Sequence, residues 1–399
     1  MNSNTKNFHM PALRFPGFVG EWEEKTIGDI ADVLQGFGFP DKYQGQTSGD
    51  LPFCKVGDIS AAVDKGERII SHAANYVDYS LLPTLRARPI PEGATIFAKI
   101  GEAIRSNKRI MTGCPCLIDN NAAAVKAKEG ESDEFVFYLM SKVNLADYAG
   151  GIVPSVNKST IETISVFIPP TIAEQKKIAS CLSDIDSLIA AQSQIVAAVK
   201  ERKKGLMQQL FPQSNETAPR LRFPGFTGDW QENSFDKICH TITPPVKLQS
   251  SQYLSEGKYP IVDQSQTLIC GWTNDASGLV TNAPFIIFGD HTCMLKYIDF
   301  PFVQGADGVK ILGVSKDNNP MFVYQLMLSN PVKQDGYKRH FSDLKEKTFF
   351  LPPTPNEQCK IAECLSSLDE VISAAQSRLD SFKEHKKGLM QQLFPQPVK

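Results

Sequence analysis

The sequence predicts an α/β protein with two α/β domains separated by a long two-helix coiled coil, related by a pseudo-twofold axis. Two repeats lead to this prediction. Residues 168–213 and 351–396 align without a gap at an offset of 183, with 27 of 46 positions identical, which indicates an internal duplication. Residues 13–22 and 221–230 match at eight of ten positions. The chain is therefore a repeated unit whose ends match and whose middles differ.

The repeats divide the chain into an anchor, a domain and a helix, each present twice. The short repeat has an offset of 208 rather than 183, so the first domain is 25 residues longer than the second. Pro-Gly between aromatic residues in each anchor predicts a turn that packs against a domain. The predicted segments are an anchor at 1–22, a domain at 23–167, a helix at 168–213, a linker with the second anchor at 214–230, a domain at 231–350 and a helix at 351–399.

Both long repeats predict helices. Thr171 with Glu174, and Thr354 with Glu357, have the spacing of a capping box, in which hydroxyl and carboxylate satisfy free N–H groups reciprocally. Apolar residues then recur at steps of four and three, which is the pattern of a coiled-coil seam. The stripes are Ile178, Leu182, Ile185, Ile189, Val196, Val199, Leu206 and Leu210, and Ile361, Leu365, Leu368, Ile372, Ala375, Leu379, Phe382, Leu389 and Leu393.

A helix of this length with one apolar face needs a partner, and the other copy is the obvious one. Two ordinary core helices are the alternative, but such helices are usually far shorter. Gln192, Lys203 and Lys386 interrupt the stripes, which weakens a seam but fixes its register. The first helix continues into the second anchor, whereas the second has no anchor after it. We therefore expect the N-terminal anchor to dock at the end of the second helix, with Phe15 near Phe394 and the termini close together.

The two middles share sequence features. TIFAKIGEAIRSNKRIM at 95–111 and FIIFGDHTCMLKYIDF at 285–300 each run from a strand into a glycine-acidic turn. AAAVKA corresponds to DGVKIL, and the helical FVFYLM corresponds to FVYQLM. Aromatic and β-branched runs between Gly, Asn and Asp turns predict short strands. We expect one skeleton of strands with a late helix in both domains, and different loops.

Composition excludes several classes of protein. The formal net charge is −2, so nucleic-acid binding would depend on local patches. The N-terminus lacks the apolar core of a signal peptide, and no apolar run is long enough to span a bilayer. We expect a cytoplasmic protein that binds no membrane. None of the nine cysteines forms a C-x-x-C pair, so reduced structural thiols are expected.

Catalytic motifs are mostly absent. The sequence has no phosphate-binding G-x-x-x-x-G-K-[ST], no G-x-G-x-x-G after a strand and no H-E-x-x-H. His291, beside Asp290 and Cys293, is the one histidine in a loop with nucleophile-like neighbours. Such a triplet is more typical of a polar turn. Two matching domains without matching acid, base or metal-binding residues favour binding over catalysis.

A long ligand contacted at two places suits two related domains on a stiff spacer, and duplex DNA is such a ligand. Arginine and lysine can contact phosphates or guanine edges, and asparagine an adenine edge. A solvated charged surface remains the alternative for each residue. The DNA-contact candidates are Arg86, Arg88, Lys99, Arg105, Asn107, Lys108 and Arg109 in the first domain, and Asp290, His291, Thr292, Lys296, Lys338 and Arg339 in the second.

These motifs together resemble the DNA-specificity subunit of type I restriction–modification systems. The resemblance rests on P-P-x-x-E-Q-x-x-I-A occurring twice, on GLMQQLFP at both helix ends, on the two LRFPGF segments, and on GDHT and GADGVKIL. It implies two target recognition domains that each contact half of a bipartite site, with the two helices packed antiparallel as the spacer between them. It also implies a non-catalytic adaptor for two modification subunits with S-adenosylmethionine and two restriction subunits that use ATP and Mg²⁺, with no cofactor on this chain.

The outer helix faces carry repeated residues that a mutual seam does not need. KKGLMQQLF is identical in both copies, so we expect Gln208, Gln209, Gln391 and Gln392 to contact equivalent surfaces on two copies of one partner. Two other functions remain open: an enzyme, such as a nuclease or methyltransferase, with an unrecognised site, and a coiled-coil scaffold whose domains bind proteins.

Overall fold

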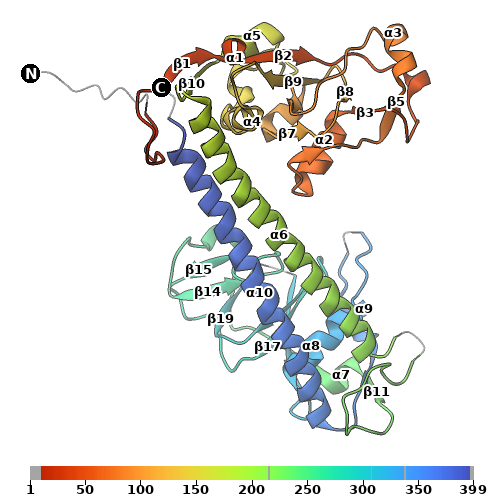
Figure 1. The fold of residues 1–399 in the computed structure, drawn as a ribbon. Helices are drawn as coiled ribbons and strands as arrows, with labels where there is room; N and C mark the ends of the chain where they lie inside the picture. The colour runs from red at the N-terminus through yellow and green to blue at the C-terminus, as the bar shows by residue number, and fades with distance from the viewer. Residues whose placement is uncertain (1–9, 214–215, 307, 337, 396–399) are drawn as a thin grey trace, which may run out of the picture. The chain divides into compact units, whose positions relative to one another are not determined.

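The structure is a computed structural model that describes residues 10–213, 216–306, 308–336 and 338–395. The chain forms two compact units (Figure 1). Unit 1 comprises Met1–Gln194 and Gln376–Lys399, and unit 2 comprises Ile195–Ala375. Each unit therefore contains one α/β domain, half of each long helix and one anchor segment.

The described residues of unit 1 form two main sheets and a two-stranded sheet of β1 and β10. The larger has the strand order β2-β9-β6-β7-β4, and the smaller has the order β5-β3-β8. Helix α4 packs on β9 and β6 of the larger sheet, and its apolar residues join the main core of the unit. The strands and helices are β1 Glu23–Thr26, α1 Ile27–Ile30, β2 Ala31–Gln35, β3 Leu51–Cys54, α2 Val56–Asp64, β4 Ile69–Ile70, β5 Asn75–Val77, α3 Leu82–Leu85, β6 Thr95–Ala98, β7 Ile110–Thr112, β8 Leu117–Ile118, β9 Ala122–Ala127, α4 Asp133–Lys142, α5 Lys158–Glu162 and β10 Ser165–Ile168.

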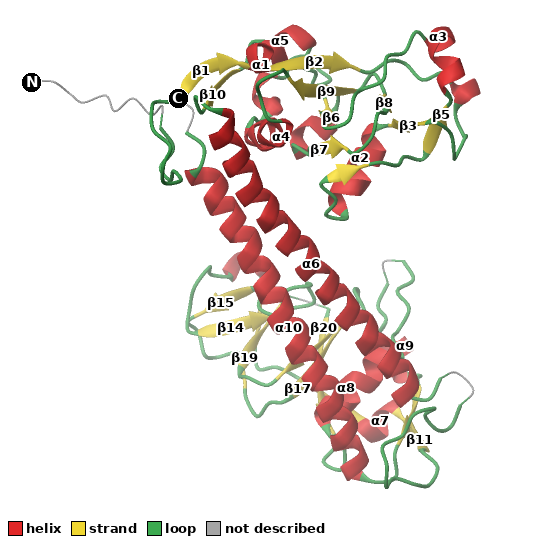
Figure 2. Cartoon of the chain, in the orientation of Figure 1, coloured by secondary structure: helices red, strands yellow, loops and turns green. Residues whose placement is uncertain are grey.

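Unit 2 repeats this arrangement (Figure 2). Its larger sheet has the order β12-β20-β17-β18, and its smaller sheet is built on β13-β19-β14-β15 with β16 beside β19. The strands and helices are β11 Gln231–Ser234, α7 Phe235–Ile238, β12 Cys239–Ile242, β13 Lys247–Leu248, β14 Tyr259–Val262, β15 Gly271–Thr273, β16 Leu279–Val280, β17 Phe285–Gly289, β18 Leu295–Ile298, β19 Phe302–Gly305, β20 Val309–Val314, α8 Pro320–Ser329, α9 Phe341–Lys345 and β21 Thr348–Leu351.

The predicted common skeleton is confirmed. In each larger sheet the strand that comes first in the sequence pairs with a late strand (β2 with β9, β12 with β20). The late strand pairs in turn with β6 in unit 1 and with β17 in unit 2, and the loop after β6 or β17 is called the variable loop of its domain. In each smaller sheet the central strand has one antiparallel and one parallel neighbour. The α/β class is confirmed as well, and all nine cysteines are free thiols, as expected.

The two duplicated segments form the long helices α6, Ile172–Leu210, and α10, Pro355–Gln392. In unit 1 the start of α6 and the end of α10 join one core, which includes Leu182 and Leu393. In unit 2 the end of α6 and the start of α10 do the same, through Leu210 and Leu365. Since higher numbers on α6 meet lower numbers on α10, the predicted antiparallel pairing is confirmed within each unit. Figure 1 shows the two helices side by side.

Ion pairs sit among the apolar seam residues. In unit 1, Lys386 contacts Asp186 at 2.6 Å. In unit 2, Lys203 contacts Asp369 at 2.6 Å. The two lysines occupy the same position in the repeat, and so do the two aspartates. A lysine in the seam can pair with its aspartate in only one register of the two helices. The ion pairs therefore fix that register, as the interrupted stripes predict.

The N-terminal anchor docks at the end of α10 as expected. The Leu13 N–H donates to the Gln392 carbonyl at 2.9 Å, and the Leu221 N–H donates to the Gln209 carbonyl at 2.9 Å. Phe15 packs against the core that contains Phe394. The first anchor therefore makes non-covalently the junction that the second makes within a continuous chain. The two chain ends, which we expected to be close together, lie outside the described residues.

The expected capping boxes are replaced by another contact. The Glu174 N–H does donate to the Thr171 hydroxyl at 3.3 Å. Both Glu174 carboxylate oxygens, however, accept hydrogen bonds from Arg14 of the anchor at 2.7 and 2.8 Å. Glu357 accepts the same two bonds from Arg222. The glutamate therefore holds the anchor onto the helix, and a bidentate charged pair outweighs a bond to one N–H group.

The buried Arg14–Glu174 pair gives a stability prediction. Glu174 is 1% exposed, so Arg14→Met leaves a buried carboxylate without its partner and lowers the free energy of unfolding of unit 1 by about 3 kcal/mol. Chemical denaturation measures the change. The double variant Arg14→Met/Glu174→Met recovers most of the loss. Arg220, which is 67% exposed and pairs with Glu216, is the matched control, and Arg220→Met costs less than about 1 kcal/mol. Equal losses for both single variants would contradict this account.

Candidate nucleic-acid interface

The candidate DNA-contacting residues fall mainly in one loop of each domain. In unit 1 the loop between β6 and β7 covers residues 99–109 and includes a short 3-10 helix, Glu102–Ser106. In unit 2 the equivalent loop between β17 and β18 covers only residues 290–294. The two loops begin at equivalent strands of the common skeleton. They differ in length and in the chemistry of their side chains.

Asp290 organises the loop of unit 2 from beneath. Its side chain is 2% exposed and accepts a hydrogen bond from the Phe341 N–H at 2.9 Å. Its carbonyl accepts from the His340 N–H, and its own N–H donates to the Gly308 carbonyl. Asp290 thus ties together three segments of the chain, and its carboxylate is not available to DNA. Asp290, which the sequence predicts to contact a base, supports the loop from inside the domain in this conformation.

His291 and Thr292 lie nearer the surface and are held by Gln264. The His291 N–H donates to the Gln264 side-chain oxygen at 3.2 Å, and the Thr292 hydroxyl donates to the Gln264 carbonyl at 3.1 Å. A Cβ atom on Gly308, whose φ is +82°, would lie 2.8 Å from both Gln264 and His291. A side chain at position 308 of the GADG segment would therefore collide with Gln264 and with His291 of the GDHT segment. Sequence reasoning missed Gln264, which carries no motif of its own.

Lys296 is also buried. It lies on β18, is 5% exposed, and donates to the carbonyls of Asp263 and Thr267 at 2.7 and 2.6 Å. Burial lowers the pKa of its ammonium group. Lys296, a predicted DNA contact, fastens the 263–267 loop from inside the domain in this conformation. Lys338 and Arg339, in the segment before α9, are exposed, so a phosphate could reach them.

In unit 1 the loop is held by two residues that were predicted to contact bases. Arg109 is 6% exposed, donates to the Asn107 side-chain oxygen at 2.7 Å, and lies over the Phe97 ring. Burial lowers its pKa to about 9. The Asn107 amide donates to the Ser141 carbonyl, at the end of α4. In this conformation both polar atoms of the Asn107 side chain and most of Arg109 are bonded inside the domain, where they support the loop.

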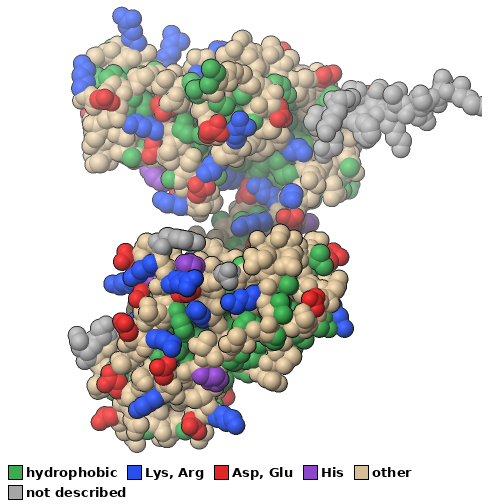
Figure 3. All heavy atoms as spheres, turned by 180° about the vertical axis from the view of Figure 1, so that it is seen from behind, with side chains coloured by type: hydrophobic (Ala, Val, Ile, Leu, Met, Phe, Trp, Pro, Cys, Tyr) green, Lys and Arg blue, Asp and Glu red, His purple; other side chains and the backbone are tan. Residues whose placement is uncertain are grey.

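The other cations of unit 1 differ in accessibility. Lys99 is 9% exposed, and burial lowers its pKa. The Arg105 side chain is 66% exposed and pairs with Glu102, and Lys108 pairs with Asp64 at 2.7 Å. Arg86 and Arg88 are exposed, but they follow α3 on the smaller sheet rather than lying in the β6–β7 loop. Figure 3 shows Lys and Arg side chains interspersed with acidic ones, so positive charge is local.

A pair of glutamines that sequence reasoning missed fastens each domain to its helix. The Gln175 side-chain oxygen accepts from the Ser132 N–H at 3.0 Å, at the start of α4. The Gln358 side-chain oxygen accepts from the Asn319 N–H at 2.8 Å, at the start of α8. The repeated Glu-Gln of the motif was the available signal: the glutamate binds the anchor and the glutamine binds the domain.

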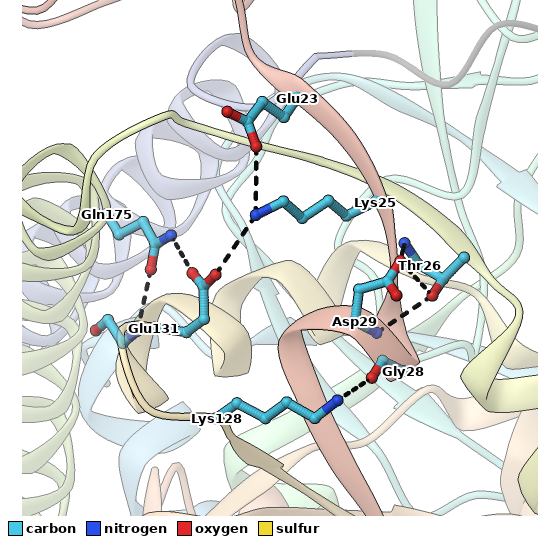
Figure 4. A network of polar contacts seen from close by, with 9 residues as sticks. Glu23, Lys25, Thr26, Gly28, Asp29, Lys128, Glu131 and Gln175 are labelled. Carbon is cyan, nitrogen blue, oxygen red and sulfur yellow. Dashed lines mark hydrogen bonds and ion pairs between the residues drawn. The ribbon is translucent and has the colours of Figure 1, made fainter.

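Figure 4 shows the surroundings of Gln175. Its amide nitrogen donates to Glu131, and Lys25 of β1 lies between Glu23 and Glu131. Nearby, Lys128 donates to the Gly28 carbonyl, beside the capping box of Thr26 and Asp29. This network joins the first strand, the segment before α4 and the start of α6, so the orientation of the domain on its helix half is set by several polar contacts.

A second link joins each late helix to the long helices. The Tyr138 hydroxyl of α4 donates to Asp186 at 2.8 Å. In unit 2 the Gln325 amide of α8 donates to Asp369 at 2.9 Å. These are the aspartates that also pair with Lys386 and Lys203. One carboxylate in each unit therefore holds three helices together.

The four glutamines predicted to bind a partner, Gln208, Gln209, Gln391 and Gln392, are exposed on the helix ends. Within the described residues no group of His, Cys, Asp and Glu side chains has the arrangement of a metal site. None of the described helices is long and apolar enough to cross a membrane.

Comparisons with known proteins agree with this architecture. The family model of the type I restriction modification DNA specificity domain matches residues 20–201 and again 227–381. The putative type I restriction enzyme MjaX specificity subunit of Methanocaldococcus jannaschii is 25% identical over 265 residues, which are 60% of this chain and 60% of that protein. The MjaVIII specificity subunit of the same organism is 23% identical over 304 residues, 66% of this chain and 69% of that one.

A solved structure shows the same fold. The S subunit of a type I restriction–modification system from M. genitalium superposes with a TM-score of 0.66 over 98% of this chain and 100% of that chain, at 14% sequence identity. At that identity the likeness concerns the fold alone. The fold and the two family-model matches agree on a protein built from two copies of one domain type.

Proposed function

Because the chain belongs to the family defined by the type I restriction modification DNA specificity domain, we propose that it is the non-catalytic subunit that recognises a bipartite DNA site. It directs the methylation and cleavage carried out by partner subunits. One observation carries the proposal: two domains with one skeleton are fixed in the same way to paired helices, but their variable loops differ. Equal supports with unequal loops suit recognition of two different half-sites.

Affinity and sequence preference come from different residues in this proposal. Exposed cations contact phosphates and supply the salt-dependent part of the affinity. Side chains at the loop surface contact base edges in the major groove. Buried Asp290, Lys296 and Arg109 hold the loops in shape, together with half-buried Asn107. The proposed contact residues are Arg86, Arg88, Arg105 and Lys108 in unit 1, and His291, Thr292, Lys338 and Arg339 in unit 2.

Salt dependence tests whether the ligand is DNA. The double variant Lys338→Ala/Arg339→Ala removes two exposed cations, so it lowers the slope of log affinity for duplex DNA against log salt concentration by about 2. Fluorescence anisotropy with a labelled duplex at several salt concentrations measures the slope. The double variant Lys204→Ala/Lys387→Ala removes two lysines of α6 and α10 that are each 65% exposed, and it leaves the slope unchanged. A wild-type affinity that hardly varies with salt would favour the protein-binding scaffold instead.

The division of labour between the domains has a genetic test. Residues 231–350 are exchanged for the corresponding domain of another specificity protein, and methylated adenines are mapped across the genome in cells that also make the modification subunits. One half of the methylated sequence changes and the other half stays, because each half is contacted by a separate domain. A change on both sides, or on neither, would refute the assignment.

We further propose that two modification subunits bind equivalent ends of the helix pair. In this proposal those subunits carry S-adenosylmethionine, two restriction subunits use ATP and Mg²⁺, and the assembly works in the cytoplasm. The identical KKGLMQQLF segments support the idea, since both copies present exposed glutamines that the seam does not bury.

The stoichiometry of the complex tests the glutamines. Gln208→Ala/Gln209→Ala removes one binding surface and leaves one modification subunit bound, and Gln391→Ala/Gln392→Ala does the same at the other surface. Sedimentation or mass photometry counts the bound copies. The exposed Gln194, which lies outside the identical segments, is the control, and Gln194→Ala leaves two copies bound. Two copies bound to both double variants would rule out this role for the glutamines.

A further inference from the structure

An exposed apolar turn lies beside the variable loop of unit 1. Three large apolar side chains within six residues face solvent: Tyr148 is 45% exposed, Val153 is 60% exposed and Ile152 is 105% exposed. A fully exposed isoleucine forgoes about 1.5–3 kcal/mol that burial of its side chain would contribute. In the described residues of unit 1 this turn is a surface feature that folding does not explain.

The turn is held firmly rather than trailing from the domain. Gly150 and Ser155 exchange two backbone hydrogen bonds across it, at 3.2 and 3.1 Å. Gly151 has a φ of +91°, which glycine adopts without strain. On either side of the turn, Leu145 and Val156 are buried in the main core. Ile152 is therefore presented at the tip of a fixed turn.

Backbone bonds attach this turn to the proposed DNA-contacting loop. The Gly101 N–H donates to the Pro154 carbonyl at 2.8 Å, and the Val156 N–H donates to the Lys99 carbonyl at 3.0 Å. The 3-10 helix that carries Arg105 packs against the one that ends at Tyr148. An apolar tip beside an exposed arginine and the Lys99 segment matches DNA, because its phosphates attract cations while its base steps accept apolar side chains.

We propose that Ile152, with Val153 beside it, inserts as an apolar wedge between two base pairs of the half-site bound by unit 1. The inference rests on the DNA-binding function proposed above. Insertion unstacks one step and bends the duplex, which costs a few kcal/mol. Burial of the wedge and extra phosphate contacts offset this cost. Pyrimidine–purine steps unstack most easily, so the half-site of unit 1 contains such a step where the wedge enters.

At its described positions that match Ile152 and Val153, unit 2 has no such wedge. Helix α5 in unit 1 corresponds to α9 in unit 2 at the repeat offset of 183. At that offset Asp335 and Gly336 are the residues equivalent to Ile152 and Val153. An acidic residue and a glycine cannot insert into a base stack. The two domains thus differ in how they recognise DNA as well as in the bases they contact.

The experiment uses the full chain with its modification subunits and a duplex carrying the mapped methylation sequence. 2-Aminopurine replaces one base at a time in the half-site of unit 1, outside the methylated adenine. Wild-type protein raises its fluorescence at one step, because unstacking relieves quenching. Ile152→Ala abolishes that rise and weakens binding about tenfold, as expected for losing much of a buried isoleucine side chain. Ile152→Leu retains both, because leucine also fills the step.

Val19, in the N-terminal anchor and 82% exposed, gives the matched control: Val19→Ala keeps the fluorescence rise and the affinity. A melting temperature of the Ile152→Ala variant equal to that of the wild-type protein verifies that the fold is intact. If Ile152→Ala keeps both the rise and the affinity while Arg105→Ala weakens binding, DNA binding stands and the wedge is refuted. If wild-type protein shows no salt-dependent duplex affinity, the proposed function itself fails. A rise that survives in Ile152→Ala with lower affinity also overturns the wedge.

Discussion

The structure depends on one carboxylate in each unit that three helices share. Asp186 accepts from Lys386 of the antiparallel helix and from Tyr138 of the domain helix, and Asp369 does the same with Lys203 and Gln325. An apolar seam at 4-3 spacing can slide by a heptad with little loss of burial, but these charged contacts cannot. The shared carboxylate therefore sets the register of the helices and the position of the domain together. A bipartite recognition protein needs both to be fixed.

The duplicated segments carry the contacts that hold each domain on the helices, whereas the loops of the two domains differ in length and sequence. Arg14 with Glu174 and Arg222 with Glu357 are equivalent contacts, as are the bonds from Leu13 and Leu221 to helix-end carbonyls. Each joins an anchor to a helix and involves no residue of the variable loops. The β6–β7 and β17–β18 loops can consequently change in length and charge without disturbing how their domains are mounted.

Regular features were predictable from the sequence, and the partners of individual polar side chains were not. Apolar spacing predicted α6, α10 and their pairing, because periodicity reports directly on a buried helix face. The Thr-x-x-Glu spacing was read as a capping box, yet Glu174 binds an arginine 160 residues away. Lys296 and Arg109 are predicted DNA contacts because Lys296 follows the GDHT segment and Arg109 lies in a basic loop. Whether a cation faces solvent or the carbonyls of a distant segment is decided by tertiary packing, which sequence spacing does not show.

Several predicted contact residues are bonded inside the domains, within the loops where recognition is proposed. Arg109 and Asn107 fasten the loop of unit 1 to the end of α4, and Asp290 joins three segments of unit 2. A loop held by buried charge loses little conformational freedom on binding, which favours affinity and discrimination between bases. Changing such a residue moves the exposed side chains that it supports. Sequence preference can therefore depend on residues that never touch DNA, and a change at Gln264 or Gly308 affects recognition through His291 and Thr292.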